Sequence, residues 1–177
     1  MATNQVPTAP ADATLAGYLQ SIELAVADAY DKIIGFLGEA AKPTATTFQG
    51  HHRAYADALA KQAGASAAPG PNPTLGFILG VRLLDVTDEI GALTLASAIE
   101  DQVAQTQAFA FTTLTTPAVI HLVATILPVI TAHAAILGAS AGLATAALFP
   151  HGALEGTAIG DGSDSKVGFD PASFPVS

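Results

Sequence analysis

Four segments of the chain carry apolar residues at alternating spacings of three and four, and this pattern limits the fold to a bundle of packed helices. The segments cover about residues 11–40, 45–63 and 88–115, and a fourth runs from Pro117 to about Gly138. Two of their starts carry ordinary helix signals: Asp88 and Glu89 stand in the first turn of the third segment, and Pro117 follows Thr116. The sequence therefore predicts an all-α protein.

The connections between these segments predict the topology of the bundle. A few residues around Pro43 join the first two helices and TTP at 115–117 joins the last two, so each pair is expected to be antiparallel. The stretch at 64–86, GASAAPGPNPTLGFILGVRLLDV, is Gly- and Pro-rich and then apolar. About twenty extended residues reach roughly 60 Å, while a helix of twenty-five is roughly 37 Å long. We therefore expect two helical hairpins joined by one long crossover.

A charge-free region raises the question of a membrane span. No Asp, Glu, Lys or Arg occurs between Asp101 and Glu155, and the segment from Pro117 is long enough to cross a bilayer. That segment contains two histidines and an internal Pro128, and it lacks flanking Lys or Arg anchors. We interpret it as a buried helix of the bundle, and a membrane span is the disfavoured alternative.

Composition limits the partners. The net charge of −9 comes without any basic run, so nucleic acid is not expected as a partner. The chain has no cysteine, which excludes thiolate chemistry and iron–sulfur clusters. Only 12% of residues are charged, against roughly a quarter in ordinary soluble domains. So few charges predict self-association, or association with another protein, through charge-poor helix faces.

The chain divides into a bundle domain and a tail. Residues 1–148 contain all four periodic segments, whereas residues 149–177 are rich in Gly, Ser, Asp and Pro and are predicted to form an irregular C-terminal tail. The first twenty residues show neither the positive start nor the continuous apolar core of a signal peptide. The default expectation is a cytoplasmic protein, and export after removal of a signal is the alternative.

In each of the four segments the recurring apolar residues form a stripe along one face of the predicted helix. Each stripe contains one polar residue of a type that binds metals. These residues are Glu23, His52, Glu100 and His133. A carboxylate on an apolar stripe is costly unless it is paired, hydrogen-bonded or bound to a metal, and an imidazole carries a smaller cost of the same kind. If the four meet at one level, they offer the oxygen and nitrogen ligands that suit iron, manganese or zinc.

The segments SIELAVADAY, FQGHHRAYADAL, LASAIEDQVAQTQ and PVITAHAAIL resemble the core helices of ferritin-like proteins, particularly the bacterial ferritin-like domain proteins. The resemblance covers residues 12 to about 140 and implies a ferritin-like four-helix bundle. In that family the first and third helices each provide a terminal glutamate ligand, and the second and fourth each provide Glu-x-x-His. The resemblance places Glu23 and Glu100 at the single-glutamate positions and His52 and His133 at the histidine positions.

The two bridging glutamates of the family are missing. Gln49 stands three residues before His52, and Ile130 stands three residues before His133. Di-metal oxidase chemistry is therefore not expected, and no catalytic residue is assigned. Two hypotheses remain: a site for iron, manganese or zinc formed by Glu23, His52, Glu100 and His133, or a metal-free structural or self-assembling protein on a degenerate scaffold. His51 lies about 100° around its helix from His52 and is predicted to be a surface or interface residue.

Overall fold

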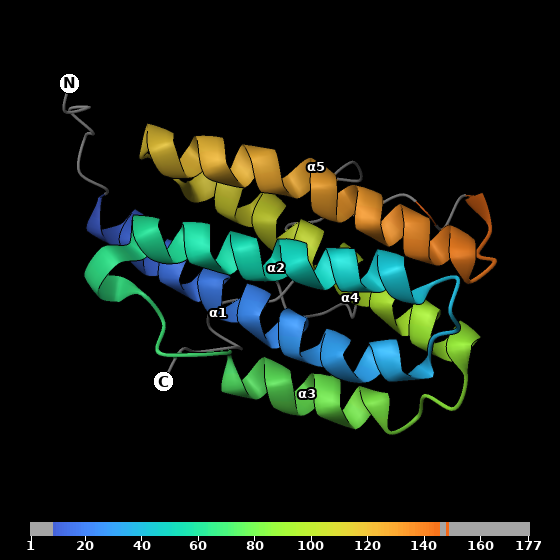
Figure 1. The fold of residues 1–177 in the computed structure, drawn as a ribbon. Helices are drawn as coiled ribbons and strands as arrows, with labels where there is room; N and C mark the ends of the chain where they lie inside the picture. Colours follow the sequence, from blue (N-terminus) through green and yellow to red (C-terminus); the bar gives the residue numbers. More distant parts are fainter. Residues whose placement is uncertain (1–8, 146–147, 149–177) are drawn as a thin grey trace, which may run out of the picture.

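The computed structural model describes residues 9–145 and 148, and these form a bundle of helices (Figure 1). The α-helices are α1 (Pro10–Ile33), α2 (Lys42–Ala63), α3 (Pro73–Leu83), α4 (Glu89–Thr113) and α5 (Pro117–Ser140). Short 3-10 segments follow α1 at Ile34–Phe36 and α2 at Gly64–Ser66. The described residues contain no strand, so the all-α prediction is confirmed.

The helices pair as two antiparallel hairpins. α1 packs along α2 and α4 packs along α5, and contacts of α1 with α4 and of α2 with α5 join the hairpins. The crossover from α2 to α4 runs along the bundle, as predicted, but it contains the additional helix α3 beside α1 (Figure 1). The Asn72 side chain caps α3 by accepting a hydrogen bond from the Leu75 N–H at 3.0 Å. The α3 residues form the apolar part of the crossover segment, and no helix was predicted there.

The first helix is shorter than predicted, and its continuing apolar period explains the error. The predicted segment was 11–40, but α1 ends at Ile33 and the backbone is extended at Leu37 (φ −86°, ψ 145°). Leu37 is nevertheless only 4% exposed, so its side chain remains in the core after the helix has ended.

The other predicted helices lie closer to their observed bounds. α2 begins at Lys42 instead of residue 45, while α4 and α5 begin and end within two residues of the predicted positions. The predicted tail at 149–177 lies outside the described residues.

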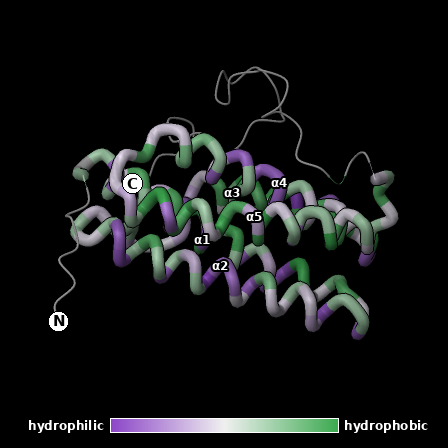
Figure 2. Tube along the Cα trace, turned by 90° about the horizontal axis from the view of Figure 1, so that it is seen from above, coloured by the Kyte–Doolittle hydropathy of each residue, from purple (hydrophilic) through white to green (hydrophobic). Residues whose placement is uncertain are grey.

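α5 contains the charge-free apolar segment. Among the described residues it is the one helix long and apolar enough to cross a membrane by length and composition, with a mean hydropathy of 2.0 in its most apolar window, of which 33% is buried. It packs against α4 and α2 and turns Val123, Ile126 and Ile130 into the core. Hydrophobic colours extend along much of α5 in Figure 2, whereas hydrophilic positions recur along α2. The predicted apolar stripe of this helix faces the core.

The buried carboxylate of Asp12 connects the start of α1 to the turn between α4 and α5. It accepts hydrogen bonds from the Thr115 backbone N–H at 2.9 Å, from the Thr115 hydroxyl at 3.1 Å and from the Thr116 backbone N–H. Burial alone would raise the pKa of Asp12, but the hydrogen bonds from Thr116 and Thr115 outweigh it and lower the pKa. This contact ties the ends of the two hairpins together.

The close approach of α1 to the 3-10 segment that follows α2 requires a glycine. A Cβ atom on Gly17 would lie 2.0 Å from the carbonyl oxygen of Ser66. We expect Gly17→Ala to lower the free energy of unfolding by about 1–3 kcal/mol, because the backbone must move to relieve the clash. Urea denaturation of the two proteins measures this difference.

Gly50 provides the matched control. It is exposed on α2, and a Cβ atom there would meet nothing within 4 Å. Gly50→Ala is expected to raise the free energy of unfolding by about 0.5–1 kcal/mol, because alanine is the better helix former. Equal effects of the two substitutions would contradict the packing of α1 against Ser66.

Candidate metal centre

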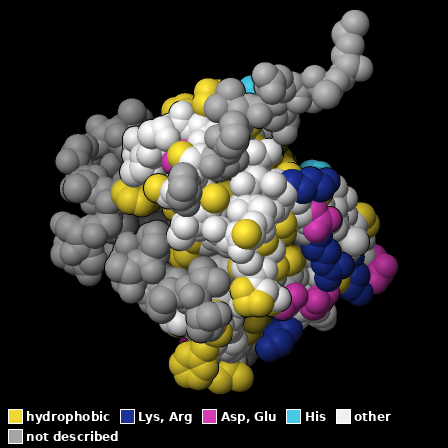
Figure 3. Space-filling model, turned by 90° about the vertical axis from the view of Figure 1, so that its left-hand side faces the viewer, with side chains coloured by type: hydrophobic (Ala, Val, Ile, Leu, Met, Phe, Trp, Pro, Cys, Tyr) yellow, Lys and Arg dark blue, Asp and Glu magenta, His cyan; other side chains and the backbone are white. Residues whose placement is uncertain are grey.

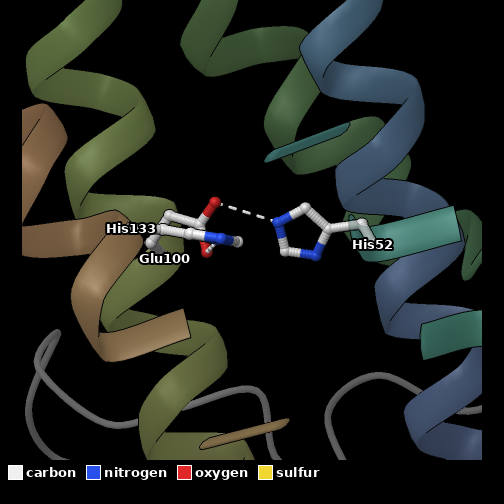
Figure 4. A group of neighbouring side chains, drawn as sticks. All are labelled: His52, Glu100 and His133. Carbon is white, nitrogen blue, oxygen red and sulfur yellow. Dashed lines mark hydrogen bonds and ion pairs between the residues drawn. The ribbon is translucent and has the colours of Figure 1, made fainter. Parts of the chain in front are cut away.

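Four helices each bring one of the predicted polar side chains into the middle of the bundle. Glu23 on α1, His52 on α2, Glu100 on α4 and His133 on α5 are all buried, none being more than 2% exposed. Ligand-type atoms of His52, Glu100 and His133 all lie within 4.8 Å of one another. Figure 4 shows Glu100 and His133 pointing from α4 and α5 toward the ring of His52 on α2. These three residues are called the core cluster below.

Glu23 lies on the other side of the His52 ring from this cluster. Its Oε2 is 2.6 Å from His52 Nδ1, whereas the opposite nitrogen, Nε2, is 2.9 Å from Glu100 Oε1. The four residues predicted as one ligand set are thus arranged as a cluster of three with Glu23 behind His52. A metal-bound histidine commonly donates its second N–H to a carboxylate, which is the position that Glu23 occupies here.

The two carboxylates hold His52 in its charged form. Burial alone would lower the pKa of His52, but the charges and hydrogen bonds of Glu100 and Glu23 outweigh it and raise this pKa to about 10. Burial alone would likewise raise the pKa of Glu100, but the neighbouring His52 and His133 lower it to about 2. His52 therefore holds a proton on each ring nitrogen, and the Nε2 proton must leave before that nitrogen has a lone pair to offer.

Two further buried side chains support the carboxylates. The Tyr30 hydroxyl donates a hydrogen bond to Glu100 Oε1, and Gln107 Nε2 donates one to Glu23 Oε1 at 2.7 Å. Burial and the adjacent Glu100 charge raise the pKa of Tyr30 well above its usual value, so the hydroxyl remains a donor. Gln107 lies seven residues after Glu100, on the same face of α4, but no feature of the sequence assigned it to the site.

Two atoms of the core cluster have no hydrogen-bond partner among the described residues. They are Glu100 Oε2 and His133 Nδ1, both buried, and the contact between them is 3.5 Å long. That separation is too long for a well-formed hydrogen bond. Buried polar atoms without a partner are uncommon and cost about 1–3 kcal/mol each. A carboxylate oxygen and a ring nitrogen beside a second imidazole are the ligand types of iron, manganese and zinc sites, so these residues fit such an ion.

His51 contacts the cluster at its edge. Its Nδ1 lies 2.9 Å from Nε2 of His133, and its side chain is half-buried instead of lying on the open surface. Burial, followed by the nearby His133 and His52, lowers the pKa of His51. The sequence contained a signal for this position: Phe48, His51 and Tyr55 follow the same three-and-four spacing as Phe48, His52 and Tyr55.

The positions of the missing bridging glutamates supply no carboxylate. Gln49 turns its amide toward α1, where it donates hydrogen bonds to the Ala27 carbonyl at 2.9 Å and to Asp31 Oδ1 at 2.6 Å. Ile130 is fully buried as part of the apolar core. The two glutamates that would bridge two metal ions in the related family are therefore replaced by an amide that is already hydrogen-bonded to α1 and by an apolar side chain.

The fold and this cluster define an all-α bundle with a core of carboxylates and imidazoles drawn from four helices. The sequence of residues 12–143 matches the family model of the ferritin-like domain, and the chain belongs to that family. The predicted membership is thereby confirmed. No curated protein and no solved structure matches the chain. The ferritin-like domain and the buried His/Glu/His cluster are together compatible with a metal site.

Proposed function

We propose that the bundle core binds one divalent transition-metal ion, iron, manganese or zinc, through His52, Glu100 and His133. The observation that carries this proposal is the pair of buried atoms without partners, Glu100 Oε2 and His133 Nδ1, beside the His52 ring. Both atoms are of ligand types that such ions accept, and a cation between them would give each the partner that it lacks.

The surrounding residues have supporting roles in this proposal. Glu23 accepts a hydrogen bond from His52 Nδ1 and fixes the orientation of that ring, while Gln107 holds Glu23 and Tyr30 holds Glu100. Iron or manganese at this site would supply redox chemistry, and zinc would supply Lewis acidity. The amide of Gln49 and the hydrocarbon of Ile130 favour one ion over a bridged pair, so di-metal oxidase activity is not proposed.

Metal content tests the proposal directly. Protein purified without an affinity tag is loaded separately with Fe²⁺, Mn²⁺ or Zn²⁺, dialysed and analysed by mass spectrometry, and about one equivalent is expected for a single mixed-ligand site. At a free concentration of a hundred times Kd, the ion is expected to raise the free energy of unfolding by about 2.7 kcal/mol. His133→Ala should lose both effects.

The exposed His121 on the same helix is the control for that substitution. His121→Ala is expected to retain the metal, because this residue lies outside the core cluster. Wild-type protein that retains none of the three ions would contradict the proposal. Equal metal loss in both variants would show that the ion binds elsewhere.

The second candidate function is a metal-free, self-assembling scaffold, and the surface of α3 favours it. Phe77 and Val81 on α3 and Leu84 directly after it are 73%, 46% and 81% exposed, which is unusual for large apolar side chains. In Figure 3 the charged side chains gather on one side of the visible face, and uncharged and hydrophobic atoms occupy most of the remaining described surface. Such a surface supports association of charge-poor helix faces. A monomer in sedimentation velocity at micromolar concentration would remove this candidate.

A further inference from the structure

α3 presents apolar side chains on two faces, and the described helices cover only one of them. The buried face is formed by Leu75, Leu79 and Leu83. On the outer side, Phe77 and Val81 on the helix and Leu84 directly after it recur at spacings of four and three, so they line up on one exposed face. In Figure 3 hydrophobic side chains project at the lower end of the molecule, the height at which α3 lies in Figure 1. The three exposed residues are called the α3 row below.

A groove runs beside the α3 row, between α3 and α1. It has a volume of about 280 Å³, and its walls include Gly76 and Gly80 of α3 and Ala25 and Ala29 of α1. A cavity of about 150 Å³ is enough to hold a benzene molecule, so the groove has room for a phenylalanine side chain. Because Phe77 directly follows Gly76, the α3 row and the groove lie about 100° apart around the same helix.

The two glycines of the groove have no structural reason among the described residues. Both lie in the interior of α3 with φ outside the left-handed region, and a Cβ atom on either would meet nothing within 4 Å. Glycine destabilises the interior of a helix relative to alanine, so both positions weaken α3. What the glycines provide is open space between α3 and α1, where a side chain from outside can enter.

The charges around the groove suit a second copy of this chain. At a net charge of −9, two identical chains repel one another over most of their surfaces. α3 contains no acidic residue, and its one base, Arg82, donates a hydrogen bond to Gln102 Oε1 at 2.9 Å. The groove has one exposed residue of each sign, Asp28 and Lys32, so its charges cancel. Two copies can therefore meet at α3 without the repulsion that their acidic surfaces would cause.

We propose that two copies of the chain associate about a two-fold axis at α3, with Phe77 of each copy inserted into the groove between α1 and α3 of the other. A two-fold contact uses the same patch on both copies, so a projecting side chain and the groove that accepts it must lie on one surface, as they do here. Such a contact covers both α3 rows and fills both grooves. It rests on the self-assembling candidate function, identifies the surface which that function would use, and is independent of the metal site.

The contact is small, because α3 has only 11 residues. Specific, stable interfaces commonly bury about 1,600 Å² in total, and interfaces below about 1,200 Å² are typical of weak association. We therefore expect a reversible dimer with a Kd on the order of micromolar. Sedimentation velocity of the full chain is measured across about 1–100 μM, a range that brackets such a Kd.

Two substitutions remove the two halves of the contact. Phe77→Ala removes the inserted side chain, and Gly80→Leu fills the groove from within the same chain. Each is expected to raise the Kd of the dimer by about 30-fold or more, which is the loss typical of a buried aromatic anchor at an interface. Gly80→Leu is also expected to leave the monomer at least as stable in urea denaturation, because leucine is the better helix former and the position is open. Weaker association without weaker folding separates the contact from a general defect.

Mixing the two variants tests whether the copies exchange Phe77. The Phe77→Ala chain retains an open groove and the Gly80→Leu chain retains Phe77, so a mixed dimer keeps one of the two insertions. An equimolar mixture is expected to associate about fivefold more tightly than either variant alone, the square root of the 30-fold loss, because half of the contact is kept.

The matched controls lie on other helices. Ile136→Ala removes an exposed apolar side chain from α5, and Gly50→Leu adds one at an open position on α2. Both variants are expected to dimerise like wild type, because neither residue belongs to the α3 row or to the groove.

The possible results distinguish this contact from self-association in general. If wild type dimerises and neither Phe77→Ala nor Gly80→Leu weakens the dimer, the α3 contact is overturned while the self-assembling candidate function stands. Weakened variants whose mixture stays dissociated overturn the reciprocal insertion of Phe77. A wild type that is monomeric throughout the range overturns both the contact and the self-assembling candidate function, and leaves residues 149–177 of the same chain as the segment to test against the α3 row.

Discussion

Glu100→Ala is expected to lower the free energy of unfolding of the metal-free protein by about 3–5 kcal/mol, because it breaks a buried ion pair and leaves its partners uncompensated. Glu100 accepts hydrogen bonds from Tyr30 and from His52, and all three side chains are fully buried. Without the carboxylate, the charge of His52 is balanced by Glu23 alone and the Tyr30 hydroxyl has lost its acceptor. Urea denaturation in the presence of a chelator measures the loss.

Two controls show whether the charge of Glu100 or merely its volume is responsible. Glu100→Gln keeps the size and one acceptor oxygen, so it should retain part of the stability that alanine loses. Glu39→Ala removes a carboxylate that is 93% exposed and paired with Lys42, and a change within about 0.5 kcal/mol is expected there. A similarly small change for Glu100→Ala would mean that the core tolerates an unpaired imidazolium, contrary to the geometry described above.

Adding metal to the same variants separates the two candidate functions. If the core binds an ion, Zn²⁺ raises the unfolding free energy of wild type and leaves that of Glu100→Ala unchanged, because the ligand is gone. If the network is a metal-free element of the structure, the difference between the two proteins is the same with Zn²⁺ and with chelator. The comparison is decisive because each protein serves as its own reference.

The spacing of apolar residues predicted the helices well where only one face of the helix is apolar and buried. It predicted them poorly where the buried pattern continues past the helix or where both faces are apolar. The stripes located α2, α4 and α5 within a few residues, since their apolar faces bury into one core. The end of α1 was missed because Leu37 continues the buried pattern after the helix has ended. α3 was missed because Phe77 and Val81 are exposed apolar residues, and periodicity cannot indicate a helix whose outer face is as apolar as its inner face.

The sequence predicted which polar side chains lie in the core better than it predicted their arrangement. A stripe gives the face on which a side chain lies, but it does not give the height at which two helices are packed. Which nitrogen of His52 meets Glu23 and which meets Glu100 depends on that height and on the ring rotamer. His51 was set aside because its angle was measured only from His52, whereas its partner, His133, stands on another helix.

Replacing the whole network by apolar residues is expected to have the opposite effect to removing Glu100 alone. The combined variant carries Glu23→Leu, Tyr30→Phe, His52→Leu, Glu100→Leu, Gln107→Leu and His133→Leu. Buried ion pairs replaced by hydrophobic residues of similar volume often leave stability unchanged or raise it by about 1–4 kcal/mol, because the desolvation cost disappears together with the attraction. We expect this result for the metal-free protein, measured by urea denaturation in chelator.

This outcome would decide why the chain carries charged groups in its core. A combined variant that folds, is at least as stable as wild type and binds no metal would show that the network is not needed to hold the bundle together. The destabilisation that the polar network causes in the metal-free protein would then be explained by the role of the network in binding an ion. A combined variant that is less stable, or that loses the near-ultraviolet circular dichroism of fixed side-chain packing, would show that the polar contacts specify how the four helices pack. The metal-free scaffold would then be the better account, because Glu23, His52, Glu100 and His133 would be required whether or not an ion is present.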